Sequence, residues 1–150
     1  MARTKILLVD NDPDFLETRR EFLEKEGYEV IPASSPRKAM KALELGGIDL
    51  AILDIRLLND DDEKDISGLE LAKIVGRSTP VIMLTAYPAI DYARQALEPQ
   101  ADGVRIAQGF IAKMDGPIAL LTTIRKTLET PKRQLVSRGK KLVDASSKIW

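Results

Sequence analysis

The sequence predicts an α/β fold in which five β-strands alternate with five α-helices. Five short apolar segments recur along the 150 residues, and amphipathic segments with helix-start and helix-stop signals lie between them. Four of the apolar segments are almost unbroken, which is typical of strands buried on both faces of a parallel sheet. Right-handed crossover connections then place helices on both faces of a five-stranded parallel sheet.

The expected strands are residues 6–9, 28–33, 50–53, 81–84 and 110–112. The second strand, YEVIPA, alternates between apolar and polar residues more than the others and therefore suits the edge of the sheet. The intervals between strands are longer in the second half of the chain. We attribute this to loop insertions at residues 59–65, with the acidic sequence NDDDEKD, and at residues 104–108.

Every expected helix begins at a cap residue, a proline or both. In chain order these starts are Asp12-Pro13, Ser35-Pro36, Ser67, Pro88 and Gly116-Pro117, and glycines close the first two helices at residues 27 and 46–47. Apolar residues at helical spacing are expected to face the sheet. They are Phe15, Leu16, Phe22 and Leu23; Ala39, Met40 and Leu43; Leu69, Ala72 and Val75; Ile90, Ala93 and Leu97; and Ile118, Leu121, Ile124 and Leu128.

Charge divides the chain into two parts. Residues 131–150 hold six Lys or Arg and one Asp, a net charge of +5, whereas residues 1–130 hold 17 basic and 22 acidic residues, a net charge of −5. We therefore expect one domain over residues 1–130 and a basic helix or linker over residues 131–150. Leucine or isoleucine recurs every seven residues from 121 to 149, which leaves open a coiled-coil seam or a helix packed on the domain.

The composition excludes several kinds of site. The chain has no cysteine and no histidine, which excludes disulfides, thiolate metal sites and imidazole catalysis. A bound metal must therefore have oxygen ligands, which favours a hard cation such as Mg²⁺. No apolar run is long enough for a signal peptide or a membrane span, so we expect a cytoplasmic protein that makes no membrane contact.

The carboxyl ends of the expected strands carry the residues with the most distinctive chemistry. Asp10 and Asn11 follow the first strand, Asp54 follows the third, Thr85 follows the fourth and Lys113 follows the fifth. Ligands of open parallel sheets bind outside these strand ends. A carboxylate nucleophile, further oxygens for Mg²⁺, a hydroxyl and an ammonium group together favour transfer of a phosphoryl group to an aspartate.

The segments ILLVDNDPDF, LAILDIRL, VIMLTAY and GFIAK resemble the motifs of the first, third, fourth and fifth strands of response-regulator receiver domains. The resemblance extends over roughly residues 4–129. It implies a flavodoxin-like fold with the strand order 2-1-3-4-5, and a phosphoryl donor that is a histidine kinase or a histidine phosphotransfer protein.

The resemblance also implies a role for each matched residue. Asp54 is the phosphoacceptor, and Thr85, Lys113 and Phe110 match the switch hydroxyl, the phosphoryl-binding lysine and the aromatic residue that repacks on activation. Mg²⁺ would be held by Asp10, Asn11, Asp54 and the backbone carbonyl of Arg56. Phosphorylation would then change the surface formed by the fourth helix, the fifth strand and the fifth helix.

Three positions depart from the family pattern: Asn11, Leu58 and Met114, which replaces the proline that often follows the lysine, so we expect no cis peptide there. Asn11 stands where the family usually has an acid, so we expect weaker Mg²⁺ binding. Leu58 replaces a proline, and the insertion that follows it holds five acids in seven residues, which either reach toward the metal or, as we expect, form a solvated surface loop. Arg56 and Tyr87 are bulky residues at positions that border the path of the hydrolytic water, so we expect slow self-dephosphorylation.

Two alternative functions remain to be weighed. A receiver that has lost phosphorylation would act only as an interaction module. A phosphatase of the haloacid dehalogenase type would use Asp10 as its nucleophile, but it needs a further acidic pair beyond Lys113 and leaves Asp54 without a role. We therefore expect a signalling protein whose only chemistry is its own phosphorylation and dephosphorylation. A homodimer, through the switching surface or the C-terminal segment, stays open, and no DNA contact is expected.

Overall fold

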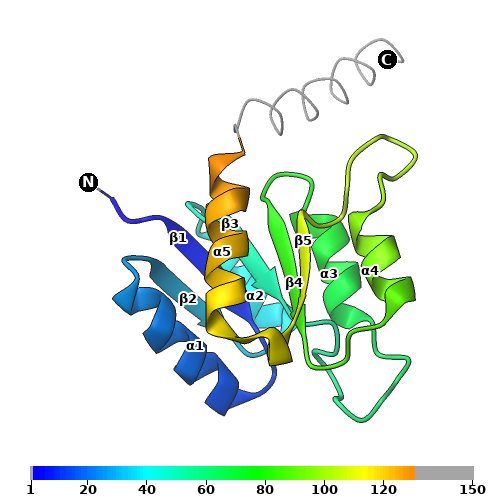
Figure 1. Cartoon of the computed structure of the whole chain (residues 1–150), viewed down its shortest axis with the longest axis horizontal. Helices are drawn as coiled ribbons and strands as arrows, with labels where there is room; N and C mark the ends of the chain where they lie inside the picture. The colour runs from blue at the N-terminus through cyan, green and yellow to red at the C-terminus, as the bar shows by residue number, and fades with distance from the viewer. Residues whose placement is uncertain (1, 131–150) are drawn as a thin grey trace.

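The five apolar segments form one parallel sheet in a computed structural model that describes residues 2–130 (Figure 1). The strands are β1 (Lys5–Val9), β2 (Glu29–Ala33), β3 (Leu50–Leu53), β4 (Val81–Thr85) and β5 (Gly109–Ala112). They pair in the order β2-β1-β3-β4-β5, which confirms the predicted strand order. The connection from β2 to β3 passes over β1 and leaves the carboxyl ends of β1, β3 and β4 next to one another, where Val9 lies opposite Leu53.

The helices alternate with the strands as predicted. They are α1 (Pro13–Lys25), α2 (Pro36–Glu44), α3 (Ser67–Val75), α4 (Ile90–Leu97) and α5 (Gly116–Glu129), with a short 3₁₀ helix η1 (Lys113–Asp115) before α5. Asp12 caps α1 by accepting hydrogen bonds from the amides of Asp14 (3.0 Å) and Phe15 (3.3 Å). Ser35 caps α2 in the same way, through the amide of Lys38 at 3.2 Å.

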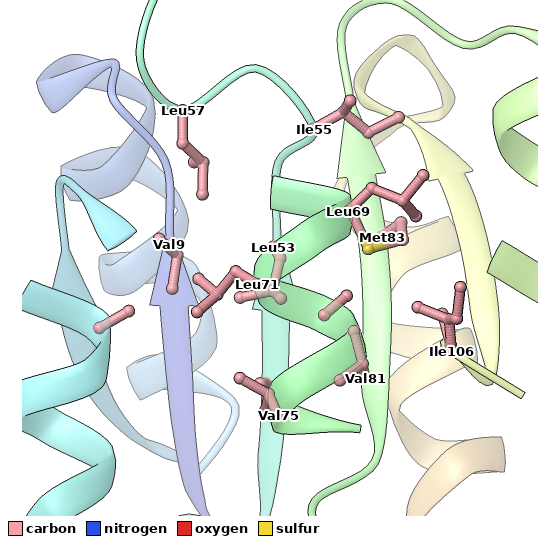
Figure 2. Packing of buried hydrophobic residues seen from close by; sticks show 14 of the residues in the cluster. Val9, Leu53, Ile55, Leu57, Leu69, Leu71, Val75, Val81, Met83 and Ile106 are labelled. Carbon is pink, nitrogen blue, oxygen red and sulfur yellow. The ribbon is translucent and has the colours of Figure 1, made fainter. Parts of the chain in front are cut away.

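The sheet separates two apolar layers. Alternate strand residues face opposite sides, so Ile6 and Leu8 pack with α1 and α5, whereas Leu7 and Val9 pack with α2, α3 and α4. Figure 2 shows the second layer, in which Leu69 and Val75 of α3 are buried in one cluster with Leu53 and Met83 of the sheet. Each fully buried aliphatic side chain of this kind stabilises the fold by about 1.5–3 kcal/mol relative to an exposed one.

In two helices, one residue predicted to face the sheet is exposed, whereas Leu121 and Ile124 of α5 are buried as predicted. Ile90 is 78% exposed and Ile118 is 66% exposed, and Ala96 and Leu120 are buried instead. In α5 the buried stripe runs through residues 120, 121, 124 and 127, and Ile118 lies two residues before it, on the opposite side of the helix. In α4 the helix begins at Ile90 and not at Pro88, so its first apolar residue sits at the exposed helix start.

Strand β2 lies at the edge of the sheet, as its sequence predicted. The amide of Glu29 donates to the Thr4 carbonyl (2.9 Å) and the Ala33 carbonyl accepts from the Asp10 amide (3.1 Å), so the odd-numbered residues of β2 face β1. Pro32 therefore has its backbone nitrogen on the free side of the strand.

Both predicted insertions are loops. Residues 54–66 connect β3 to α3, and residues 98–108 connect α4 to β5 through a turn closed by an antiparallel bridge between Pro99 and Arg105. The helix or linker predicted for residues 131–150 lies outside the described residues. Across residues 2–130, no helix has both the length and the apolar character needed to cross a membrane.

Candidate functional site

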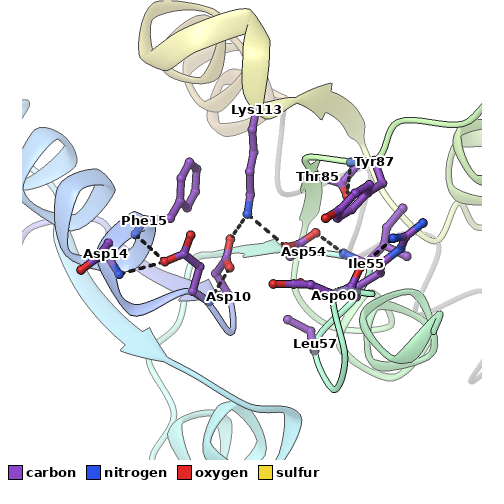
Figure 3. Close-up of polar contacts among 12 residues, drawn as sticks. Asp10, Asp14, Phe15, Asp54, Ile55, Leu57, Asp60, Thr85, Tyr87 and Lys113 are labelled. Carbon is purple, nitrogen blue, oxygen red and sulfur yellow. Dashed lines mark hydrogen bonds and ion pairs between the residues drawn. The ribbon is translucent and has the colours of Figure 1, made fainter. Parts of the chain in front are cut away.

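The ends of β1, β3 and β5 bring two carboxylates and one ammonium group together (Figure 3). The Lys113 Nζ atom lies 2.5 Å from Asp10 Oδ2 and 3.1 Å from Asp54 Oδ2. Asp10 and Asp54 are each only 2% exposed. The predicted phosphoacceptor, acidic residue and lysine thus form one buried ion cluster, in which a single cation is shared by two acids.

Burial and crowding raise the pKa of Asp10 to about 6. The largest cause is removal of its carboxylate from water, and the neighbouring Asp54 charge acts in the same direction, whereas the hydrogen bond from Lys113 opposes both. For Lys113, burial alone lowers the pKa, but the hydrogen bond to Asp10 and the charges of both acids raise it above the usual lysine value. The ammonium group therefore stays charged at neutral pH.

The remaining contacts orient these three side chains. Asp10 Oδ1 accepts from the Asp12 amide at 2.9 Å, and Asp54 Oδ1 accepts from the Ile55 amide at 2.7 Å, so the Oδ2 atom of each acid turns toward Lys113. The Lys113 Nζ atom also lies 4.1 Å from the centre of the Phe15 ring, a cation–π contact. We predicted Phe15 as a core residue only, and its place against the lysine was missed.

The side-chain oxygen of Asn11 is the clearest indication of a cation-binding position in this site. Its Oδ1 atom is buried and has no hydrogen-bond partner among the described residues, an arrangement that costs about 1–3 kcal/mol unless another group satisfies it. Asn11 directly follows Asp10 in the chain, and its amide oxygen with the Asp10 and Asp54 carboxylates would make an all-oxygen donor set, which fits Mg²⁺. Asp12 is exposed and caps α1, so it does not join this set, and the described residues contain no group of three acids placed to hold a metal ion.

A second group of residues lies beside Asp54. Thr85 is fully buried, and its Oγ1 atom accepts from the Tyr87 amide at 3.2 Å. The Arg56 guanidinium stacks 3.7 Å from the centre of the Tyr87 ring and donates to the Asp60 carbonyl at 2.7 Å. Figure 3 shows Thr85 and Tyr87 on the opposite side of Asp54 from Asp10. Phe110 is half-buried and packs against the apolar layer on the α2–α3–α4 side.

The acidic insertion is more ordered than a solvated loop. Asp61, Asp62 and Glu63 are exposed as expected, but Asp65 is only 8% exposed. Burial by itself raises the pKa of Asp65, yet hydrogen bonds from Ser67 and from backbone amides outweigh it and hold the pKa below its usual value. The expectation of a wholly solvated loop is wrong for this residue.

Gly68 packs against the backbone of Asp54, the predicted phosphoacceptor. Its amide donates to the Ile55 carbonyl at 2.7 Å, and a Cβ atom at this position would lie 1.6 Å from the Asp54 carbonyl oxygen. Only a glycine permits α3 to start this close to the end of β3. We predicted a helix after Ser67 but not this contact.

Comparison with known proteins gives a consistent family. The family model of the response regulator receiver domain matches residues 6–125. The chain is 39% identical over 95 residues to the heme response regulator HssR of Staphylococcus saprophyticus, covering 62% of this chain and 40% of that protein. It is 36% identical over 143 residues to the alginate biosynthesis transcriptional regulatory protein AlgB of Pseudomonas aeruginosa, covering 93% of this chain and 29% of that protein. The chain thus spans well under half the length of these curated relatives.

Solved structures share the fold. A CheY-like response regulator receiver domain from Methanospirillum hungatei JF-1 superposes with a TM-score of 0.67 at 28% identity, covering 93% of this chain and 99% of that one. A response regulator from Burkholderia pseudomallei superposes with a TM-score of 0.67 at 25% identity, covering 89% of this chain and 71% of that one. The latter structure contains a phosphorylated aspartic acid, a calcium ion and citrate.

Proposed function

The chain belongs to the response-regulator receiver family, and on that premise we propose that its Asp54 accepts a phosphoryl group from a histidine kinase or a histidine phosphotransfer protein. Receiver domains are the signalling modules of two-component systems. The observation that carries the proposal is the Lys113 ammonium group held between the buried carboxylates of Asp10 and Asp54, at 2.5 and 3.1 Å. A relative of known structure that contains a phosphorylated aspartic acid supports it.

In the proposed reaction, an Asp54 carboxylate oxygen attacks the phosphorus atom of a phosphohistidine. The new O–P bond forms as the N–P bond breaks, and the imidazole leaves. Lys113 is already charged and beside Asp54, so it offsets the negative charge on a phosphoryl oxygen without moving far. Thr85 is buried at the end of β4, where its hydroxyl can donate to the new phosphoryl group once it turns from the Tyr87 amide.

Mg²⁺ fits this site, and we propose that Asp10, Asn11, Asp54 and the Arg56 carbonyl hold it. When bound, the cation would neutralise charge on the phosphoryl oxygens. The unpartnered Asn11 oxygen supports this assignment, and the calcium ion in the Burkholderia pseudomallei structure shows that a relative holds a hard cation. Because Asn11 supplies a neutral oxygen, the site has one carboxylate fewer than the usual family pattern and binds the cation more weakly.

We further propose that phosphorylation is read out on the surface of α4, β5 and α5. A phosphoryl group adds a charge of about −1.5 to −2, which biases an equilibrium between two packings of this region. Thr85 at the end of β4 and Phe110 on β5 are the residues we expect to move. A homodimer through this surface or through residues 131–150 fits the proposal, which assigns no DNA contact to this chain.

Intact-mass analysis after incubation with acetyl phosphate tests the function. We expect the wild-type chain to gain the mass of one phosphoryl group in the presence of Mg²⁺ and none in its absence. Asp54→Ala removes the nucleophile and is expected to abolish the gain, whereas Asp61→Ala removes an exposed acid of the same loop and is expected to preserve it.

The other outcomes are equally informative. No gain under any condition would leave a receiver that acts only as an interaction module. A gain that persists in Asp54→Ala but disappears in Asp10→Ala would indicate Asp10 as the nucleophile, as in the phosphatase alternative. Either result would overturn the proposed role of Asp54.

Arg56 and Tyr87 are expected to prolong the life of the phosphoryl group. Their stacked side chains lie beside Asp54, and the Arg56 side chain is also tied to the Asp60 carbonyl, so together they restrict the approach of water. We expect Arg56→Ala with Tyr87→Ala to shorten the phosphoryl half-life about three- to tenfold, or roughly 0.7–1.4 kcal/mol of barrier. The half-life is measured after removal of the phosphodonor.

Single variants of this pair provide the control. Because each side chain supports the other, either single substitution should produce most of the effect of the double one. A half-life that is unchanged in the double variant would show that the pair does not restrict water.

A further inference from the structure

The segment that follows the proposed phosphoacceptor is held by two side chains, Asp65 at the end of the acidic insertion and Ser67 at the start of α3. Asp65 Oδ2 accepts hydrogen bonds from the amides of Leu58 (2.9 Å) and Asn59 (2.7 Å). Its Oδ1 atom accepts from the amide (3.0 Å) and the hydroxyl (2.6 Å) of Ser67. These four hydrogen bonds use the full accepting capacity of the buried Asp65 carboxylate. Its side chain is therefore fixed in place and is not a solvated surface charge.

Ser67 links Asp65 to the peptide unit between Arg56 and Leu57. Because the Ser67 hydroxyl donates its proton to Asp65, its oxygen presents a lone pair, which accepts from the Leu57 amide at 3.1 Å. The Leu57 N–H and the Arg56 C=O belong to the same planar trans peptide unit and point in opposite directions. Fixing the N–H toward Ser67 therefore fixes the direction of the Arg56 carbonyl, the proposed backbone ligand of the cation.

The same contacts explain how the chain tolerates Leu58. The family resemblance places a proline at this position, which would restrict the backbone by its ring but has no N–H to donate. Here the Leu58 N–H is used, and Asp65 binds it. The inserted loop thus supplies, through a hydrogen-bonded carboxylate, the rigidity that a proline ring would supply through its covalent structure.

We infer that Asp65 and Ser67 are positioning residues of the phosphorylation site, which aim the Arg56 carbonyl at the bound cation by fixing the peptide between Arg56 and Leu57. This inference rests on the proposed function, since it assigns a role toward the same cation. It gives the insertion at residues 59–65 a function inside the site. The exposed acids of the loop, by contrast, do not take part in this anchoring.

The test measures the Mg²⁺ dissociation constant of the full chain by isothermal titration calorimetry. Replacing a residue that orients a metal ligand typically costs 10–100-fold in affinity. We expect Asp65→Asn to weaken Mg²⁺ binding about tenfold and Ser67→Ala to weaken it about threefold. These losses lie at or below the low end of that range because the oriented ligand is one carbonyl among several ligands. Asp61→Asn makes the same chemical change on an exposed acid of the loop and is expected to stay within about twofold of wild type.

Three further measurements separate positioning from other roles. Phosphorylation by acetyl phosphate should fall in Ser67→Ala at low Mg²⁺ and recover at saturating Mg²⁺, which a general loss of structure would not produce. Chemical denaturation without Mg²⁺ reports the fraction folded, and if Asp65→Asn does not fold, Ser67→Ala decides. The conservative variant Ser67→Thr keeps a hydroxyl at this position. It should therefore keep most of the Mg²⁺ affinity that Ser67→Ala loses.

Several outcomes would overturn the inference. Folded Asp65→Asn and Ser67→Ala proteins with wild-type Mg²⁺ affinity would show that the carbonyl is not positioned by this pair. Equal losses in Asp61→Asn and Asp65→Asn would show an effect of loop charge alone. If the wild-type chain is phosphorylated normally in either case, the proposed function survives, whereas a wild-type chain that binds no Mg²⁺ and takes up no phosphoryl group would remove both.

Discussion

Gly68→Ala is expected to lower the free energy of unfolding by about 3 kcal/mol or more and to abolish phosphorylation of Asp54. The new Cβ would lie 1.6 Å from the Asp54 carbonyl oxygen, 2.6 Å from its carbonyl carbon and 2.9 Å from Ile55 Cα. All three atoms belong to the backbone, so no side chain can rotate away to make room. Either α3 or the end of β3 must shift, and both carry the site.

Urea denaturation measures the stability, and intact-mass analysis with acetyl phosphate measures the function. Gly27→Ala is the control, because Gly27 has a φ of +98° with nothing within 4 Å of the added atom. Its cost should be only the backbone strain of a non-glycine residue, about 1–2 kcal/mol, with phosphorylation preserved. A Gly68→Ala protein that is phosphorylated normally and unfolds within 1 kcal/mol of wild type would contradict the close contact.

Asp10→Asn is expected to stabilise the protein by roughly 1–3 kcal/mol at pH 7.5 in the absence of Mg²⁺. Burial raises the pKa of Asp10 to about 6 from its ordinary value of 3.8. The folded state therefore keeps the Asp10 proton up to about pH 6, whereas the unfolded state loses it near pH 4. The free energy of unfolding of the wild type should therefore fall as the pH rises from about 4 to about 6 and stay low above pH 6. The asparagine of the Asp10→Asn variant cannot ionise, so the variant does not lose this stability.

The measurement is urea denaturation at pH 4 and pH 7.5. The stabilisation by Asp10→Asn should be small at pH 4, where the wild-type residue is already protonated. Mg²⁺ should stabilise the wild type more than the variant, since the variant replaces a proposed carboxylate ligand with a neutral amide oxygen. Asp12→Asn is the matched control: asparagine caps a helix about as well as aspartate, so its stability should change by less than about 0.5 kcal/mol. A destabilised Asp10→Asn protein at pH 7.5 would contradict the assigned pKa direction.

The gathering of Asp10, Asp54 and Lys113 could be predicted because it follows from topology. Residues that directly follow parallel strands reach the same edge of the sheet, whatever the sequence between them. The helix caps at Asp12 and Ser35 were predicted from local signals and the strand order from the family resemblance, and both are confirmed. The catalytic and metal-binding roles of these residues stay predictions until they are measured.

The parts that were missed depend on packing that no local pattern contains. In a run of five acids nothing marks Asp65 as buried, although Ser67-Gly68 at the start of an apolar helix is the kind of signal that could have raised the question. Phe15 was read as core because an aromatic residue at helical spacing does not reveal the lysine above it. Ile90 and Ile118 were assigned to the wrong side because two overlapping apolar stripes can be drawn on a short helix, and only the sheet decides between them.

The proline of the edge strand has a consequence for how the protein behaves at high concentration. An open sheet edge offers unpaired N–H groups on which another chain can add a strand, the first step toward aggregation. In β2 the residues facing outward are Val30 and Pro32, and Pro32 has no N–H, so Val30 is the one residue of this strand that offers a free donor. A strand from another molecule could accept only one backbone hydrogen bond from β2, whereas stable pairing needs a series of them. This edge is therefore protected against intermolecular β-pairing.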